Sequence, residues 1–191
     1  SKLVEKIQKY NFQLKVFCLV RAPYSAFCSG IQQGIKVGNY YELISLNDCV
    51  PTSFKTLPFS KSNVVEKLIS FFGNTISLES FEHACTNSHG PVGFLLKHFL
   101  NQDPTDFVYA KTNESLYNLS VRIQNEFNFT YPAYLDGNKL NKKFRRFPAN
   151  VDEKLKCTGK FLLTEVEYHL VEKFVQTEIA RLGEIAGLDF R

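Results

Sequence analysis

The chain has 191 residues, 44% of them hydrophobic and 22% charged, so it can bury a core, and wholesale disorder is excluded. No apolar run approaches the roughly 20 residues that a membrane-spanning helix needs. The 23 basic and 19 acidic residues give a net charge of +4, but they are unevenly distributed. The chain begins with serine and lacks methionine, and we expect residues 1–191 to be a single globular domain from a larger protein.

The first part of the chain has the pattern of a small sheet. Residues 2–9 predict a short helix, and residues 12–20, rich in β-forming side chains, predict a buried strand. Pro23 suits a turn or a first helical position, and a helix is expected over 24–34. A second strand is expected over 39–46. Strand, helix and strand in this order are typical of a βαβ-like unit.

The rest of the chain is mainly helical in pattern. After an irregular connection over 48–59, apolar residues at helical spacing predict helices over 61–72, 78–86, 91–100, 115–127 and 164–182. Ser60 is the expected N-cap of the first of these, and Thr164 to Glu167 form a capping box before the last. Residues 105–110 fit either a strand or a helix start capped by Asp103. The predicted fold class is α+β, a small N-terminal sheet with a mainly helical remainder packed as one unit.

Cysteine usage and glycosylation sequons point to different compartments. The five cysteines are odd in number and scattered, which favours free thiols and an intracellular location, cytoplasmic or nuclear. They are Cys18, Cys28, Cys49, Cys85 and Cys157. Three sequons, at Asn113, Asn118 and Asn128, instead fit a secreted chain, but such triplets arise often by chance in a chain rich in asparagine and serine. We therefore expect free thiols.

The positive charge is concentrated in the segment 139–160. It holds eight basic residues against Asp152 and Glu153, a net charge of +6, whereas the remainder has 15 basic and 17 acidic residues. The basic residues are Lys139, Lys142, Lys143, Arg145, Arg146, Lys154, Lys156 and Lys160. Such a cluster fits a polyanionic partner, although a solvated surface that only adds solubility has the same composition.

Apolar residues run through the same segment. Leu140, Phe144 and Phe147 have the spacing of one helix face, which predicts an amphipathic helix over 139–147 that displays its cations to solvent. Tyr131 and Tyr134 lie just upstream, where exposed rings could stack on nucleic-acid bases. The segment therefore has both elements of a nucleic-acid surface.

Other residue types that carry chemistry give weaker patterns. His83, Cys85 and His89 are close in sequence, but a structural zinc site needs four ligands, so no metal or cofactor is predicted. Glu165 and Glu167 belong to the last predicted helix, where a solvated face is the expected role. No nucleophile elbow, Walker A loop or dinucleotide fingerprint occurs in the sequence.

One stretch resembles a known family. "LKVFCLVRAPYSAFCSGI" followed by "YYELISL" is similar to the strand, Pro-Tyr turn, helix and strand that open thioredoxin-like and glutathione-transferase-like domains. The resemblance implies thiol chemistry on Tyr24 or Ser25, with Cys28 in the same helix, although the CxxC pair is absent.

Three functions follow from these observations. The leading hypothesis is a non-enzymatic module that uses the segment 139–160 to bind a polyanion, with nucleic acid as the first partner and an acidic protein as the second. The alternative is a thiol-handling enzyme of the thioredoxin or glutathione-transferase type, or a degenerate relative, centred on Tyr24, Ser25 and Cys28. The third is a protein–protein scaffold domain.

Overall fold

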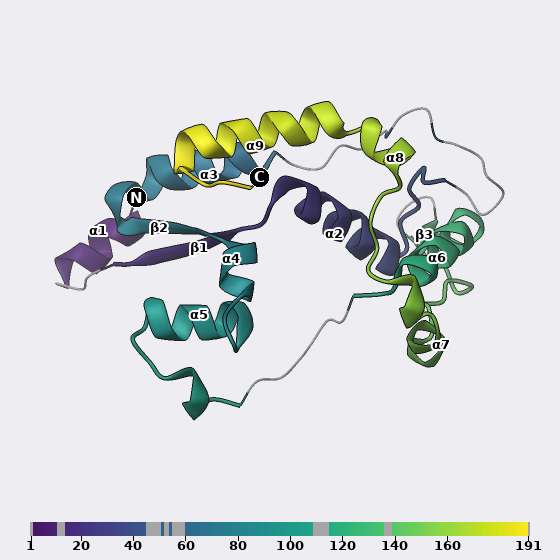
Figure 1. Ribbon diagram of the computed structural model, residues 1–191, viewed down its shortest axis with the longest axis horizontal. Coiled ribbons are helices and arrows are strands. Elements are labelled where there is room, and N and C mark those ends of the chain that lie inside the picture. The colour runs from purple at the N-terminus through teal and green to yellow at the C-terminus, as the bar shows by residue number, and fades with distance from the viewer. Residues whose placement is uncertain are drawn as a thin grey trace. The chain divides into compact units, whose positions relative to one another are not determined.

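A computed structural model describes residues 2–10, 14–44, 51, 54, 60–108, 115–135 and 139–190 (Figure 1). The fold is α+β, a two-stranded parallel sheet and a short hairpin among helices. The helices are α1 (Lys2–Lys9), α2 (Pro23–Lys36), α3 (Lys61–Phe72), α4 (Phe81–Cys85), α5 (Gly90–His98), α6 (Asn118–Thr130), α7 (Ala149–Lys154), α8 (Glu165–His169) and α9 (Glu172–Ala186). The strands are β1 (Val16–Val20), β2 (Ile76–Ser80), β3 (Tyr134–Leu135) and β4 (Lys139–Leu140), and the 3-10 turns are η1 (Gly73–Thr75), η2 (Pro104–Asp106) and η3 (Lys156–Thr158).

The chain forms two compact units. The first comprises Ser1–Pro23, Phe59–Ala110 and Val175–Arg191, and the second comprises Tyr24–Pro58 and Lys111–Phe174. Each unit therefore draws on segments that are distant in sequence, and the two are described separately. That residues 1–191 behave as a single domain stays a prediction.

The first unit is built on the parallel pair β1 and β2, which run in register from Val16 opposite Ile76 to Val20 opposite Ser80. The strand predicted over 12–20 is thus confirmed over residues 16–20, of which only Val20 is fully buried; residues 14–15 form no strand, and residues 12–13 lie outside the described residues. Its partner was expected over 39–46, but residues 39–44 form no strand, and residues 45–46 lie outside the described residues. The partner β2 instead occupies the start of the region 78–86, for which a helix was predicted. Only the second half of that region is helical, as α4.

The core of the first unit lies where β1, α3 and α9 meet. Val20, Val65 and Leu182 are its buried members. Partly buried apolar residues surround them: Cys18, Ile69, Leu78, Ile185, Ala186, Leu188 and Phe190. Ser60 caps α3 as predicted, since its hydroxyl accepts the Asn63 N–H at 3.2 Å.

A buried carboxylate fixes this N-terminus of α3 to α9. Glu178 is only 4% exposed, and it accepts hydrogen bonds from the Ser60 hydroxyl (2.8 Å), the Ser62 N–H (2.9 Å) and the Ser62 hydroxyl (2.8 Å). Burial alone would raise the pKa of Glu178, but these hydrogen bonds outweigh it and hold the pKa below its usual value. The negative charge also lies at the positive end of the helix dipole.

The second unit has an unusual helix at its centre. The buried face of α6 is mostly polar, with Ser120, Gln124, Asn125 and Asn128 as well as Val121. The amides hydrogen-bond to the last turn of α2 and to the irregular backbone that follows it. Asn125 accepts the Tyr41 N–H and donates to the Tyr41 carbonyl, and Asn128 donates to the carbonyls of Ile35 and Asn39. These bonds satisfy the Tyr41 N–H and carbonyl and the Asn39 carbonyl through side chains, so these groups need no strand partner.

The last predicted helix is present but divided. Thr164 and Glu167 form the capping box, which confirms the predicted start of the helix. The helix breaks at Leu170 and Val171, which gives α8 and α9 in place of one helix over 164–182. Asp103 caps η2, so the helix-start interpretation of residues 105–110 holds as far as Asp106, and residues 109–110 lie outside the described residues.

Candidate anion-binding surface

The basic segment lies in the second unit, and its conformation differs from the prediction. Residues 139–147 do not form an amphipathic helix. Lys139 and Leu140 form β4, residues 142–143 form a turn, and the chain is irregular as far as α7. Leu140, expected to be buried, is 68% exposed, whereas Phe144 and Phe147 are half-buried. The phenylalanines can therefore anchor the segment without a helix.

Two buried amides hold the segment in this shape. The Asn141 N–H donates to the Ala133 carbonyl and its side-chain amide donates to the Pro132 carbonyl, both at 2.8 Å, while its side-chain oxygen accepts the Lys143 N–H at 3.0 Å. Further along, the Gln124 amide of α6 donates to the Arg145 carbonyl at 3.1 Å. In a helix, the backbone N–H and carbonyl groups of residues 139–147 would pair with one another. Here the backbone groups of Asn141, Lys143 and Arg145 have other partners, which favours the turn over a helix.

All eight cations named from the sequence are exposed. We refer to them together as the basic surface: Lys139, Lys142, Lys143, Arg145, Arg146, Lys154, Lys156 and Lys160. Three of them have partners within the unit. Arg145 donates to the carbonyls of Lys142 (2.7 Å) and Phe144 (2.8 Å), Lys143 lies 5.8 Å from the Tyr131 ring centroid, and Lys156 pairs with Glu153 at 3.4 Å. The other five have no hydrogen-bond or ion-pair partner for their side chains among the described residues.

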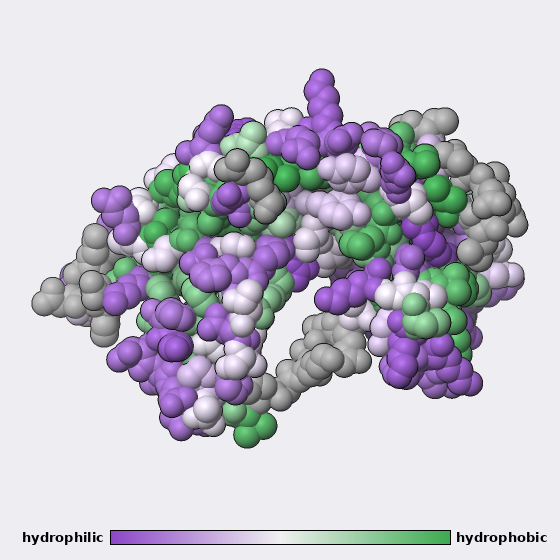
Figure 2. All heavy atoms as spheres, in the orientation of Figure 1, coloured by the Kyte–Doolittle hydropathy of each residue, from purple (hydrophilic) through white to green (hydrophobic). Residues whose placement is uncertain are grey.

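The two acidic residues of the segment have their own partners. Asp152 accepts the Tyr117 N–H at 2.9 Å, which joins α7 to the start of α6, and Glu153 pairs with Lys156. The chain after α7 is also bound to α6, because the Asn118 N–H donates to the Gly159 carbonyl at 2.8 Å. The C-terminal part of the basic segment is thus bound to the start of α6 at two points. Figure 2 shows hydrophilic side chains gathered over α7 on the face in view.

The two tyrosines predicted to stack on bases lie in different surroundings. Tyr134 is 58% exposed on β3, where an incoming base could reach its ring. Tyr131 is half-buried, packs against Phe127 with 5.1 Å between ring centroids, and has the Lys143 ammonium group near its ring. Of the two rings, Tyr134 is the one available for stacking.

The alternative thiol site lies at the start of α2. The Tyr24 hydroxyl donates to the Leu163 carbonyl at 3.4 Å, and burial raises the pKa of Tyr24 to about 12. Cys28 is 4% exposed, and burial raises the pKa of its thiol as well. A reactive cysteine needs a sulfur that solvent can reach and a thiol that readily loses its proton. Cys28 meets neither condition, because its side chain is buried and the pKa of its thiol is raised. Ser25 is half-buried, with no side-chain hydrogen bond among the described residues. The geometry therefore gives thiol chemistry no support.

The histidine and cysteine residues near α4 do not converge. His83 hydrogen-bonds to Glu79 at 3.1 Å, and His89 contacts the Ser88 hydroxyl at 3.0 Å. Within the described ranges, no group of three or more histidine, cysteine or acidic side chains has the arrangement of a metal site. Cys85 is exposed.

The cysteines and sequons can also be placed. The four described cysteines form no disulfide with one another, and Cys49 lies outside the described residues, as does the sequon residue Asn113. Asn128 is fully buried and hydrogen-bonded on both sides of its amide, so an N-glycan at this position is incompatible with the fold. Asn118 accepts a hydrogen bond from Arg122 at 3.3 Å.

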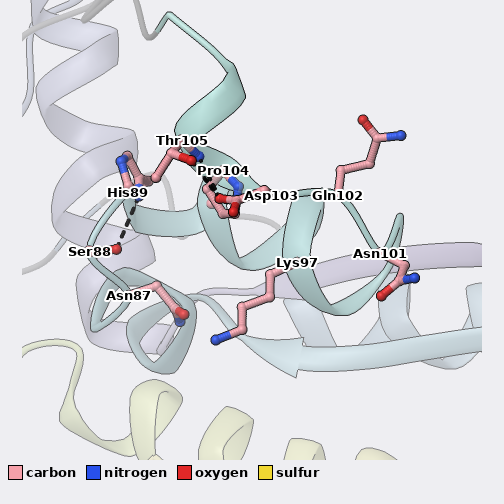
Figure 3. Close-up of a pocket in the computed structure, with 10 residues that line it drawn as sticks. Asn87, Ser88, His89, Lys97, Asn101, Gln102, Asp103, Pro104 and Thr105 are labelled. Carbon is pink, nitrogen blue, oxygen red and sulfur yellow. Dashed lines mark hydrogen bonds between the residues drawn. The ribbon is translucent and has the colours of Figure 1, made fainter.

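A polar pocket of about 420 Å³ lies in the first unit, next to α5 (Figure 3). His89, Lys97 and Asp103 are among the residues that line it. The Asp103 carboxylate accepts from the Thr105 N–H (2.9 Å) and hydroxyl (2.8 Å), and His89 contacts Ser88, so these polar groups are paired with neighbouring residues along the rim. The pocket offers little convergent chemistry.

Glu167 corrects the prediction of a solvated acidic face. It is fully buried, and Arg122 donates to its two oxygens at 2.9 Å each. It also accepts the N–H groups of Ile44 (2.7 Å) and Thr164 (2.8 Å). Burial would raise the pKa of Glu167, but the Arg122 hydrogen bonds and the backbone donors lower it. Both carboxylate oxygens of Glu167 accept hydrogen bonds from the protein, so the Arg122–Glu167 ion pair serves to hold the fold together. Glu165 is exposed, as predicted.

Comparison with protein-family models, curated proteins and solved structures found no match. Among the residues that the structure describes, no helix has both the length and the apolar character needed to cross a membrane.

Proposed function

We propose that this chain is a non-enzymatic, intracellular module that binds a polyanionic partner, nucleic acid in the first instance, through the basic surface. The observation that supports the proposal is which charged side chains of the segment 139–160 already have partners within the unit. Five exposed cations of one segment have no described side-chain partner, while Asp152 and Glu153 are paired within the unit. Phosphate groups are natural ligands for such cations, and each contact releases counterions into solution.

The structure also suggests how to test the basic surface without unfolding the protein. Arg145 is a poor choice for substitution, because its guanidinium group bonds to two backbone carbonyls and helps to form the turn. Lys142 and Arg146 are better choices, since both are exposed and neither side chain has a partner among the described residues. We therefore choose Lys142→Glu/Arg146→Glu as the test variant.

The matched control is Lys15→Glu/Lys67→Glu, which changes the net charge equally at exposed lysines of the first unit. The measurement is fluorescence anisotropy of a labelled oligonucleotide at low salt. We expect the control to keep most of the wild-type affinity and the test variant to lose at least about tenfold, since two attractions become repulsions. Equal affinity of test variant and wild type would refute the proposal, and binding only to an acidic polypeptide would favour the scaffold function.

A further inference from the structure

Exposed aromatic rings border the basic surface. Phe129 at the end of α6 is 68% exposed, Tyr134 on β3 is 58% exposed, and Tyr40 is 39% exposed. The Tyr40 and Phe129 rings contact each other, with centroids 5.0 Å apart at 55°. Rings this open contribute little to a core, and large exposed apolar side chains that gather next to a charged surface indicate an interaction site.

Hydrogen bonds bring these three rings into one region of the second unit. The Ala133 N–H donates to the Gly38 carbonyl at 3.3 Å, and the Asn128 amide donates to the Asn39 carbonyl at 2.8 Å. Tyr134 directly follows Ala133 in the chain, Phe129 follows Asn128, and Tyr40 follows Asn39. Gly38 is necessary here, because its φ of +99° is unfavourable for other residues and a Cβ atom would collide with Ala133. The rings are therefore presented by a well-defined backbone.

The hairpin and the turn after it carry cations close to Tyr134. In the β3–β4 pair, Lys139 is opposite Leu135, and Tyr134 is opposite Leu140. Residues directly opposite each other on antiparallel strands have Cα atoms about 5 Å apart. Lys142 follows in the adjoining turn, also exposed. Because successive side chains of a strand point to opposite faces, Tyr134 and Leu140 share one face of the hairpin and Lys139 and Leu135 share the other. A ring and two cations are thus exposed within a few residues of one another.

The presence of both exposed rings and exposed cations in one region distinguishes between kinds of nucleic acid. A duplex stacks its bases internally and offers mainly phosphates to a basic surface, so exposed rings would add little. A single strand exposes its base faces, and stacking on aromatic side chains is tolerant of sequence. Building on the function proposed above, we propose that this region of the second unit binds single-stranded nucleic acid, with bases stacked on Tyr134 and Phe129 and with phosphates at Lys139 and Lys142 along the hairpin and its turn.

The test compares a single-stranded oligothymidylate with a duplex that carries the same number of phosphates, at one low salt concentration, using the intact chain. We expect the single strand to bind more tightly. Phe129→Ala/Tyr134→Ala should weaken single-strand binding by about tenfold or more while leaving duplex binding unchanged, because only the stacking contribution is lost. Phe71→Ala, which removes a 54% exposed ring from the first unit, is the matched control and should change neither. Thermal unfolding of each variant checks that the fold is retained.

The possible outcomes separate this inference from the function on which it rests. If duplex and single strand bind equally, and the ring variant binds both like the wild type, the single-strand inference is overturned while polyanion binding stands. If neither oligonucleotide binds at low salt, both are overturned. Ring-dependent binding to vesicles containing phosphatidylserine, without binding to oligonucleotides, would identify an anionic membrane surface as the partner and would also overturn the inference.

Discussion

The Arg122–Glu167 ion pair gives the most quantitative prediction for the fold. Arg122→Met keeps much of the side-chain volume but removes both hydrogen bonds to a carboxylate that is fully buried. Two backbone N–H groups, of Ile44 and Thr164, would remain on that carboxylate. The variant therefore leaves a buried charge that is only partly compensated.

The expected loss is large compared with a typical domain stability. Removing one partner of a buried ion pair costs about 3–5 kcal/mol, and the two remaining backbone donors place Arg122→Met toward the lower end of that range. Against a total stability of about 5–15 kcal/mol, this loss would be obvious in a denaturant titration. Arg146→Met, an exposed arginine of the same unit, should change stability by less than about 0.5 kcal/mol.

The pH dependence identifies the cause. The pKa of Glu167 is lowered in the native protein, so its stabilising effect is present above the unfolded pKa of about 4.3 and is lost as the pH falls through the native value. Without Arg122, burial should raise this pKa instead. The difference in unfolding free energy between wild type and Arg122→Met should therefore be largest at neutral pH and shrink on acidification. Adding Glu167→Gln to the variant should recover part of the loss. A cost below about 1 kcal/mol at pH 7, or one independent of pH, would refute this account.

Three other parts of the structure can be tested in the same way. Glu178→Ala should lower the free energy of unfolding by about 3 kcal/mol, because it leaves buried serine donors unpaired; an effect below about 1 kcal/mol would contradict their burial. In the native protein, a thiol reagent should label the exposed Cys85 and Cys157 quickly and the buried Cys28 slowly, and fast labelling of Cys28 would revive the thiol alternative. Expression in a glycosylating host should yield no glycan at Asn128 in folded protein, as mass spectrometry of tryptic peptides would reveal.

Local signals predicted the elements that depend on a few neighbouring residues. The Ser60 cap of α3 and the capping box at Thr164 both occur where the sequence places them. A capping box and an N-cap join residues only a few positions apart, so short-range sequence patterns contain the relevant physics. The cations of the basic surface are exposed for a similarly simple reason, since isolated charges are rarely buried.

Predictions failed where a partner distant in sequence decides the conformation. The spacing of Leu140, Phe144 and Phe147 satisfies a helix, but the Asn141 amide binds the Pro132 carbonyl and the Gln124 amide binds the Arg145 carbonyl, and the segment is non-helical. β2 forms because it pairs with β1, and no pattern within residues 76–80 specifies that pairing.

The site residues that the sequence did not reveal are Tyr40 and Phe129. One signal was present, because Gln124 and Asn128 are polar residues four positions apart on α6 and form part of its buried stripe. Recognising that this polar stripe faces inward would have placed Phe129 on the opposite, exposed side. The burial of Glu167 was equally concealed, since its partner Arg122 is 45 positions away.

The salt dependence of oligonucleotide binding tests the central claim most directly. If the five cations of the basic surface that have no side-chain partner among the described residues each contact one phosphate, the plot of log affinity against log salt for a single strand should have a slope of about −3.5. Lys142→Glu/Arg146→Glu should make that slope shallower by more than one, while Lys15→Glu/Lys67→Glu should leave it unchanged. Two results would contradict the account: no binding of the wild type at a low salt concentration of about 50 mM, or identical slopes for the wild type and the test variant.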